Sequence, residues 1–268
     1  MLKQRIITAL ILLPIALCGF FLLEGSGFAL FIGLVVTLGA WEWARLAGFA
    51  EQLPRVVYAA VVALLLFLMY ILPDVAPWVL GAAVLWWGLA TFLVLTYPQT
   101  SGHWSSVACK LVIGLLILLP AWQGLIYIKQ SPSGNWLIMA VMILVWGADI
   151  GAYFSGRAFG KRKLAPAVSP GKSWEGVFGG LALTLIITAV TGVVLGWGIK
   201  HVLLALIGAA VVVLISVVGD LTESMFKREA GIKDSSNLLP GHGGVLDRID
   251  SLTAAIPIFA VLLWMAAS

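Results

Sequence analysis

The 268-residue chain is too apolar for a water-soluble domain, because 62% of its residues are hydrophobic and 10% are charged, against roughly 45–50% and about 25% in soluble domains. A formal charge of only +4 does not suit a nucleic-acid-binding protein, and two cysteines make no disulfide framework. With a mean hydropathy of +1.08, the composition indicates an integral membrane protein.

Nine apolar runs are long enough to span a bilayer, which takes about 20 residues of helix. They lie at about 6–23, 28–46, 56–73, 77–97, 109–128, 135–154, 176–197, 201–219 and 251–267. Lipid offers no hydrogen-bond partner to an exposed backbone, and no run alternates as a barrel strand does, so each is predicted to be a helix. We therefore expect an all-α polytopic membrane protein that forms one domain over residues 1–268.

The first run follows Lys3 and Arg5, as the core of a signal peptide would. It is longer than the usual core of about 7–15 residues and lacks a small-residue cleavage site, so we interpret it as a retained first span. All but two of the 16 Lys and Arg residues, Lys129 and Lys200, fall in alternate connections of the nine-span layout. The positive-inside rule then predicts a cytoplasmic N-terminus and a periplasmic or external C-terminus. We expect a multi-pass protein of the bacterial inner membrane.

The second run contains Glu42, the one deep acidic residue of the predicted spans. Arg45 follows three residues later on the same helix face, so we expect these two side chains to pair. A transporter would place charges near mid-span, and the nine runs are nearly free of them. The polar chemistry is predicted instead in two cytoplasmic loops, at about 155–175 and 220–250.

The first loop carries cations among glycines and hydroxyl groups, a composition that suits the binding of phosphate. Gly171-Lys172-Ser173 resembles the end of a P-loop, but Pro166 stands where the first glycine is required. The alternative is a basic patch for anionic lipid head groups, and Asp149, near the end of an apolar run, favours a functional site. The substrate-binding candidates in this loop are Arg157, Lys161, Ser169, Lys172 and Ser173.

The second loop begins with four polar residues that share one face if the preceding helix continues beyond the membrane. These are Asp220, Ser224, Lys227 and Arg228. Asp247 and Asp250 then stand one helical turn apart at the start of the last run. Oxygen ligands from two helices suit Mg²⁺ that also binds substrate phosphates. We predict a metal–phosphate site with Asp220 and Asp247 as ligands and with Asp149 and Asp250 as further candidates.

The alternative for this loop is ion pairing at the bilayer edge, among Asp220, Asp247, Arg248 and Lys227. His242, a lone histidine among glycines, is by default a turn residue. It could also donate a hydrogen bond to a phosphate, so we predict a role in substrate binding. We do not expect it to act as a general base, because an attacking phosphate is already anionic.

The segment from Ser224 to Asp250 resembles the signature of the phosphatidate cytidylyltransferase family, also called CDP-diglyceride synthases. It contains Lys227-Arg228, Lys233-Asp234, Pro240-Gly241-His242-Gly243-Gly244 and Asp247-Arg248-Ile249-Asp250. The first loop is similar to two further blocks of the family, at Tyr153-Phe154-Ser155-Gly156-Arg157 and Ser169-Pro170-Gly171-Lys172-Ser173-Trp174-Glu175-Gly176. The size and the multi-span layout are similar as well, so the resemblance extends over the whole chain.

The resemblance implies transfer of CMP from CTP to phosphatidate, which forms CDP-diacylglycerol and pyrophosphate with Mg²⁺ and, in related members, K⁺ as a second ion. We expect Asp220, Asp247, Lys227 and Arg228 to be catalytic. We expect substrate binding by Arg157, Lys161, Ser169, Lys172, Ser173, Ser224, Lys233, His242 and Arg248. The triphosphate and the lipid phosphate would be held by Lys227, Arg228, Lys172 and Arg157. A homodimer is compatible with this assignment. The rival is a CTP-dependent polyprenol or phytol kinase, which transfers the γ-phosphoryl group.

Overall fold

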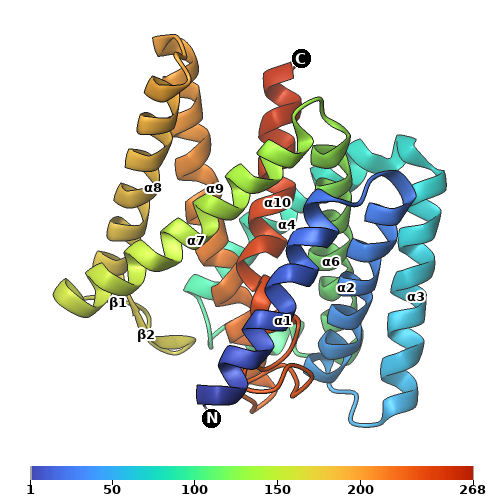
Figure 1. The fold of residues 1–268 in the computed structure, drawn as a ribbon. Coiled ribbons are helices and arrows are strands. Elements are labelled where there is room, and N and C mark those ends of the chain that lie inside the picture. The colour runs from blue at the N-terminus through green and yellow to red at the C-terminus, as the bar shows by residue number, and fades with distance from the viewer. Residues whose placement is uncertain (1, 268) are drawn as a thin grey trace.

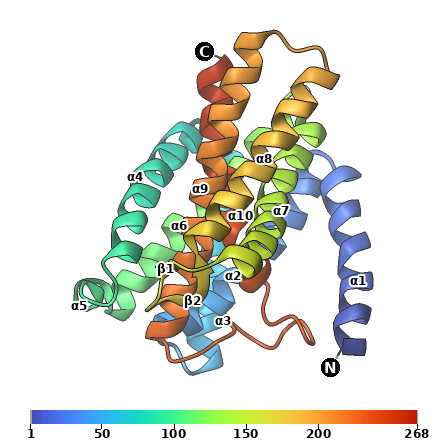
Figure 2. The ribbon, with the colours of Figure 1, turned by 90° about the vertical axis from the view of Figure 1, so that its left-hand side faces the viewer.

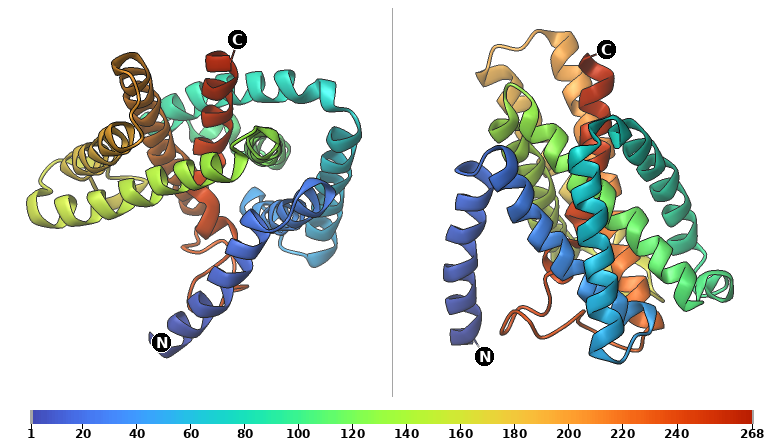
Figure 3. Two further views of the ribbon diagram at one scale, coloured as in Figure 1. Left: turned by 45° about the horizontal axis from the view of Figure 1, so that its top comes forward. Right: turned by 90° about the vertical axis from the view of Figure 1, so that its right-hand side faces the viewer.

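The computed structural model describes residues 2–267, and helices dominate it (Figures 1 and 3). In chain order the helices are α1 Leu2–Phe21, α2 Gly25–Ala47, α3 Gln52–Ile71, α4 Ala76–Leu95, α5 Ser101–Trp104, α6 Val107–Gln130, α7 Gly134–Phe159, α8 Trp174–Val194, α9 Ile199–Glu229 and α10 Leu246–Ala267. A single 3-10 turn, Pro73–Val75, precedes α4, and two short strands, β1 Lys163–Ala165 and β2 Ser169–Ser173, lie between α7 and α8. The predicted all-α class is confirmed, with one small hairpin added.

Eight of the described helices are long and apolar enough to cross a bilayer: α2, α3, α4 with the turn before it, α6, α7, α8, α9 and α10. In α1 the described apolar stretch, Leu10–Phe21, is shorter. The predicted polytopic membrane protein is therefore confirmed. Each predicted run coincides with one helix, and the largest differences are at the polar ends of α7, α9 and α10, which extend beyond the apolar runs.

The bundle is organised around α6, which packs against α2, α4 and α10. In its most apolar window 67% of the residues are buried, against 22% in α8, which lies at the edge of the bundle (Figure 2). The N-terminus, the β-hairpin and the segment between α9 and α10 lie toward one end of the bundle, and the C-terminus lies at the other (Figure 1). Termini at opposite ends agree with an odd number of crossings.

Helix α9 has 31 residues and is therefore roughly 46 Å long, well beyond the hydrocarbon thickness of about 30 Å. Its last turns are held by an aromatic stack in which Phe226 lies 4.8 Å from the ring centroids of both Trp43 and Trp104. The helix therefore continues ten residues beyond the predicted run 201–219, into the segment expected to be a loop, which is the condition under which its four polar residues share a face. It carries Asp220 and the polar residues after it beyond the apolar run.

Helices α7 and α8 approach each other closely along a stripe of small residues, as GxxxG-type membrane helices do. A Cβ atom on Gly151 would lie 2.8 Å from the Gly180 Cα, and one on Gly180 would lie 2.5 Å from the Ala148 carbonyl oxygen. Strands β1 and β2 connect these helices as an antiparallel hairpin that pairs Lys163 with Ser173. The first polar loop is consequently a short ordered turn on a tight helix pair.

Candidate active site

Two clefts are lined by the predicted polar segments. The hairpin cleft, of about 390 Å³, lies among α7, β2, α8 and α9. The loop cleft, of about 540 Å³, is formed by residues of the connection between α9 and α10 and by Arg248 of α10. The predicted substrate-binding residues divide between them. Arg157, Lys172 and Ser173 line the hairpin cleft, and Lys233, His242 and Arg248 line the loop cleft.

Small and apolar side chains form most of the hairpin cleft, and its charged groups are Asp149, Arg157 and Lys172. The apolar lining consists of Ala148, Ala152, Gly156, Gly176, Val177, Gly180, Val213 and Val217. Arg157 donates a hydrogen bond to the Tyr153 hydroxyl, at 3.2 Å. This composition suits a ligand with a charged head and an apolar body.

Asp220 stands next to the hairpin cleft and is the less restrained of the two predicted metal ligands. Its Oδ2 pairs with Lys172 Nζ at 2.5 Å, and its Oδ1 accepts the Ser224 hydroxyl at 3.2 Å. A quarter of the Asp220 side chain, 25%, is exposed. Lys172 is 48 positions away in the sequence, so only the fold brings this pair together.

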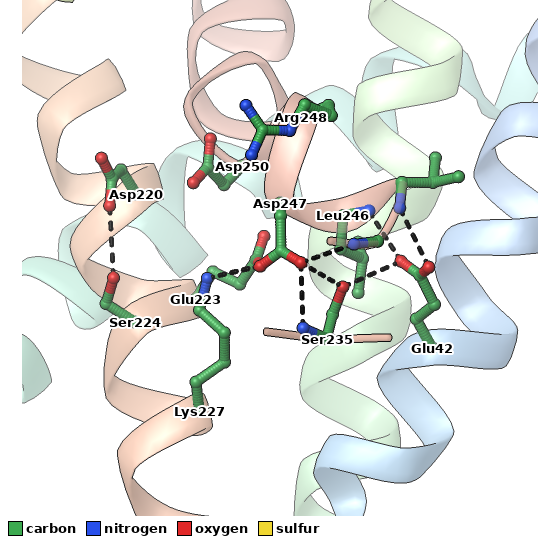
Figure 4. Close-up of polar contacts among 12 residues, drawn as sticks. Glu42, Asp220, Glu223, Ser224, Lys227, Ser235, Leu246, Asp247, Arg248 and Asp250 are labelled. Atoms are coloured by element: carbon green, nitrogen blue, oxygen red, sulfur yellow. Dashed lines mark hydrogen bonds and ion pairs between the residues drawn. The ribbon is translucent and has the colours of Figure 1, made fainter. Parts of the chain in front are cut away.

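Asp247 is held much more tightly, at the first turn of α10 (Figure 4). Its Oδ1 pairs with Lys227 Nζ at 2.7 Å, and Lys227 also pairs with Glu223 at 3.1 Å. Its Oδ2 accepts the backbone N–H groups of Ser235 and Gly244, at 2.9 and 2.7 Å, and the Ser235 hydroxyl at 2.9 Å. The side chain is only 7% exposed. The ion pair expected between Lys227 and Asp247 under the alternative interpretation is therefore present.

The expectation that Glu42 pairs with Arg45 is wrong for the described residues. Glu42 is fully buried and instead accepts hydrogen bonds from Ser235, Ser236 and the start of α10. Arg45 donates to the Ser235 carbonyl oxygen, at 3.1 Å. Helical spacing favoured the local partner, but the loop supplies four donors to a carboxylate that would otherwise be buried without any.

Three of the predicted binding groups also make internal contacts. Arg228 Nε donates to the Val168 carbonyl oxygen at 3.1 Å, which ties α9 to the hairpin turn. Arg248 donates twice to the His242 carbonyl oxygen, at 3.0 and 2.8 Å. The buried Nδ1 of His242 has no hydrogen-bond partner among the described residues, and the ring borders the loop cleft. His242 thus completes the turn with its main chain and borders the loop cleft with its ring, and its role in substrate binding stays a prediction.

The remaining residues of the first loop shape the hairpin. The Ser173 hydroxyl accepts the Gly176 N–H and caps α8. Glu175 accepts the backbone N–H groups of Lys161 and Arg162, both at 3.1 Å. Lys161 lies between α7 and β1, Ser169 begins β2, and neither lines the hairpin cleft.

A cation fits next to the hairpin cleft. Asp149 and Asp250 both lie near enough to Asp220 for their charges to repel it, and Lys172 is the ion-pair partner of Asp220. Among residues 2–267, no three His, Cys, Asp or Glu side chains converge as a complete metal centre. Mg²⁺ commonly takes only one or two carboxylates and completes its shell with water and substrate phosphates. The donors present therefore fit a metal that binds together with a phosphate substrate.

Comparison with known proteins covers almost the whole chain. Residues 3–266 match the cytidylyltransferase family. A phosphatidate cytidylyltransferase of Pseudomonas aeruginosa is 71% identical over 266 residues, which are 99% of this chain and 98% of that protein. One from Haemophilus influenzae is 45% identical, over 97% and 98% of the two chains, and one from Brucella suis is 35% identical, over 95% and 90%. The chain therefore belongs to the cytidylyltransferase family, as the resemblance of its two polar segments to phosphatidate cytidylyltransferases predicted.

Proposed function

We propose that this protein transfers CMP from CTP to phosphatidate and so forms CDP-diacylglycerol and pyrophosphate in phospholipid biosynthesis. The observation that carries the proposal is the near-complete match to relatives named phosphatidate cytidylyltransferase, at up to 71% identity. The two clefts support it. The hairpin cleft combines cationic side chains with apolar ones, and the loop cleft combines cationic side chains with polar ones.

The apolar walls of the hairpin cleft suit phosphatidate. Its phosphate would bind Arg157 and Lys172, and its acyl chains would stay in the bilayer beside α7 and α8. Lys233, His242 and Arg248 of the loop cleft would bind the triphosphate of CTP. The sequence alone left open whether Arg157 and Lys172 bind the triphosphate or the lipid phosphate, and the apolar lining of the cleft favours the lipid.

In the reaction an oxygen of the lipid phosphate attacks the α-phosphorus of CTP and forms a new P–O bond. The bond between the α-phosphorus and the oxygen that bridges it to the β-phosphate breaks, and pyrophosphate leaves. Cationic side chains neutralise the charge that moves onto the pyrophosphate. Mg²⁺ held by Asp220, with K⁺ as a second ion, would supply further charge neutralisation and bring the two phosphates together. Lys172 can exchange its contact with Asp220 for the lipid phosphate, since both side chains are partly exposed.

Labelled CTP tests the proposal against the kinase alternative. With purified protein and phosphatidate, label at the α-phosphate should enter the lipid, and label at the γ-phosphate should appear only in pyrophosphate. Added pyrophosphate should release CTP from CDP-diacylglycerol. Transfer of the γ-label to lipid, with CDP as the nucleotide product, would instead establish a lipid kinase.

We also propose that the end with the hairpin and the two clefts faces the cytoplasm of a bacterial inner membrane. All but two of the 16 Lys and Arg residues fall on this side of the nine-helix layout, which supports that orientation. A phosphatase fused after Ser268 should be active only when it is exported. Activity of a cytoplasmic reporter at the same position would contradict the orientation.

A further inference from the structure

Glu42 is the most deeply buried acidic residue near the candidate site, and each of its two carboxylate oxygens accepts two hydrogen bonds. Its side chain lies on α2, within the apolar core, with 0% of the residue exposed. Oε1 accepts the Ser236 hydroxyl at 2.6 Å and the Val245 N–H at 2.9 Å. Oε2 accepts the Leu246 N–H at 2.7 Å and the Ser235 hydroxyl at 3.1 Å. A buried carboxylate with four donors is built for a specific geometry, because burial without them would be costly.

Glu42 and Asp247 divide between them the free N–H groups at the start of α10 (Figure 4). The first N–H groups of a helix have no partner within the helix and favour negative charge. Asp247, in the first turn of α10, accepts the N–H of Gly244 just before the helix, and Glu42 accepts the next two, from Val245 and Leu246. The position of the turn that carries Asp247 therefore depends on a residue about 200 positions earlier in the chain.

The hydroxyl of Ser235 links the two carboxylates directly. It lies 3.1 Å from Glu42 Oε2 and 2.9 Å from Asp247 Oδ2, and it has a single proton to donate. Gly244 packs so closely here that a Cβ atom would collide with Ser235 Oγ and with Glu42 Oε1. Because the three groups leave no room for adjustment, a change at Glu42 must be transmitted to Asp247.

We propose that Glu42 is a positioning residue: by holding Ser235 and the first turn of α10, it sets the orientation of the Asp247 carboxylate. Glu42 lines neither cleft, so it acts through these neighbours and not on a substrate. The inference rests on the proposed function and on the expectation from the sequence that Asp247 belongs to its catalytic site.

The substitution Glu42→Gln tests this with almost no change in volume. Each oxygen of Glu42 accepts one backbone N–H group, from Val245 or Leu246, so either orientation of the new amide places its NH₂ against a backbone donor. We expect kcat to fall by about 10–100-fold, the range seen when an outer-shell partner of a catalytic ligand is lost. The Michaelis constants for CTP and phosphatidate should change by less than about threefold, because Glu42 lines neither cleft. Glu51→Gln is the matched control, because Glu51 is exposed and its side chain makes no capping hydrogen bond to α3, and it should retain wild-type activity.

Two measurements separate positioning from simple loss of stability. The activity loss of Glu42→Gln should persist per folded molecule, at temperatures well below its unfolding midpoint. In the double variant Glu42→Gln/Ser235→Ala, the fold loss in kcat should differ by at least about threefold from the product of the two single-variant losses, because residues in one hydrogen-bond network are energetically coupled. A normal kcat in Glu42→Gln, or strictly multiplicative losses, would overturn the inference.

If Glu42→Gln does not fold, Ser235→Ala decides the question, because it removes the shared hydroxyl and keeps both backbone contacts of Asp247. It should lower kcat by about tenfold, and unchanged kcat would then overturn the inference. Failure of the proposed function is a different result, since the wild-type protein itself would then form no CDP-diacylglycerol from CTP.

Discussion

The two aspartates predicted as metal ligands, Asp220 and Asp247, lie on neighbouring helices but in opposite states of restraint. Asp220 has two side-chain partners, Lys172 and Ser224, and its side chain is 25% exposed. Asp247 has four donors, two of them backbone N–H groups, and its side chain is 7% exposed. Both pair with a lysine, so the difference lies in what surrounds each pair.

This difference shows that one carboxylate can exchange partners while the other serves as a fixed reference. Asp220 can release Lys172 to a phosphate and bind a cation instead. The free-energy cost is small, because the ion pair that is lost is partly exposed. Asp247 cannot release Lys227 without leaving buried charge on Glu223 and Asp247. We therefore expect substitutions at Asp220 to affect turnover alone, and substitutions at Asp247 to affect both turnover and folding.

The largest combined effect is expected for Asp247→Asn. An oxygen can still accept the donors from Ser235 and Gly244, but the amide NH₂ then faces the Lys227 ammonium group. We expect turnover to fall at least about a hundredfold, and stability to fall by about 2 kcal/mol, the scale of a charged hydrogen bond. Labelled-CTP assays and thermal unfolding in detergent measure the two losses. Unchanged thermal stability would contradict the view that Asp247 is a fixed reference.

Asp220→Asn should separate the two effects. Turnover should again fall at least about a hundredfold, because the negative charge that would hold the cation is lost. The unfolding temperature should stay close to that of the wild type, since only one partly exposed pair is removed. Lys200→Ala, exposed at the start of α9 and far from both clefts, is the control and should behave as wild type. Near-normal activity of Asp220→Asn with unchanged Mg²⁺ dependence would reject Asp220 as a ligand.

The smallest effect sharpens the same comparison through two glycines. A Cβ atom on Gly244 would collide with Ser235 and Glu42, whereas one on Gly171 in β2 would meet no atom within 4 Å. Gly244→Ala should lower stability by about 1–3 kcal/mol, the usual cost of overpacking. Gly171→Ala should leave the unfolding temperature unchanged. Equal tolerance at both positions, measured by thermal unfolding, would show that the surroundings of Asp247 are not rigid.

Much of the fold follows from local properties of the sequence. Apolar runs of about 20 residues form helices because lipid leaves the backbone no other partner, so the helices coincide with the predicted runs. The polar residues at the end of α9 have the spacing of one helix face, but the sequence left open whether the helix continues through Arg228, and the structure shows that it does. The β1–β2 hairpin was not visible in the sequence, because Gly, Pro and Lys within three to five residues give no strand pattern.

The sequence by itself determined that this is a polytopic membrane protein of the cytidylyltransferase family. It also determined which charged residues could bind a phosphate and which short segments contain them. Those properties depend on composition and on residues close together in the chain. Only the tertiary structure decided how the charges are paired: Lys172 with Asp220, and Glu42 with the loop before α10, across 193 to 204 positions. The helical spacing of Glu42 and Arg45 suggested a local pair, but a buried carboxylate takes the partners that satisfy it most completely, and packing alone determines which donors come within reach.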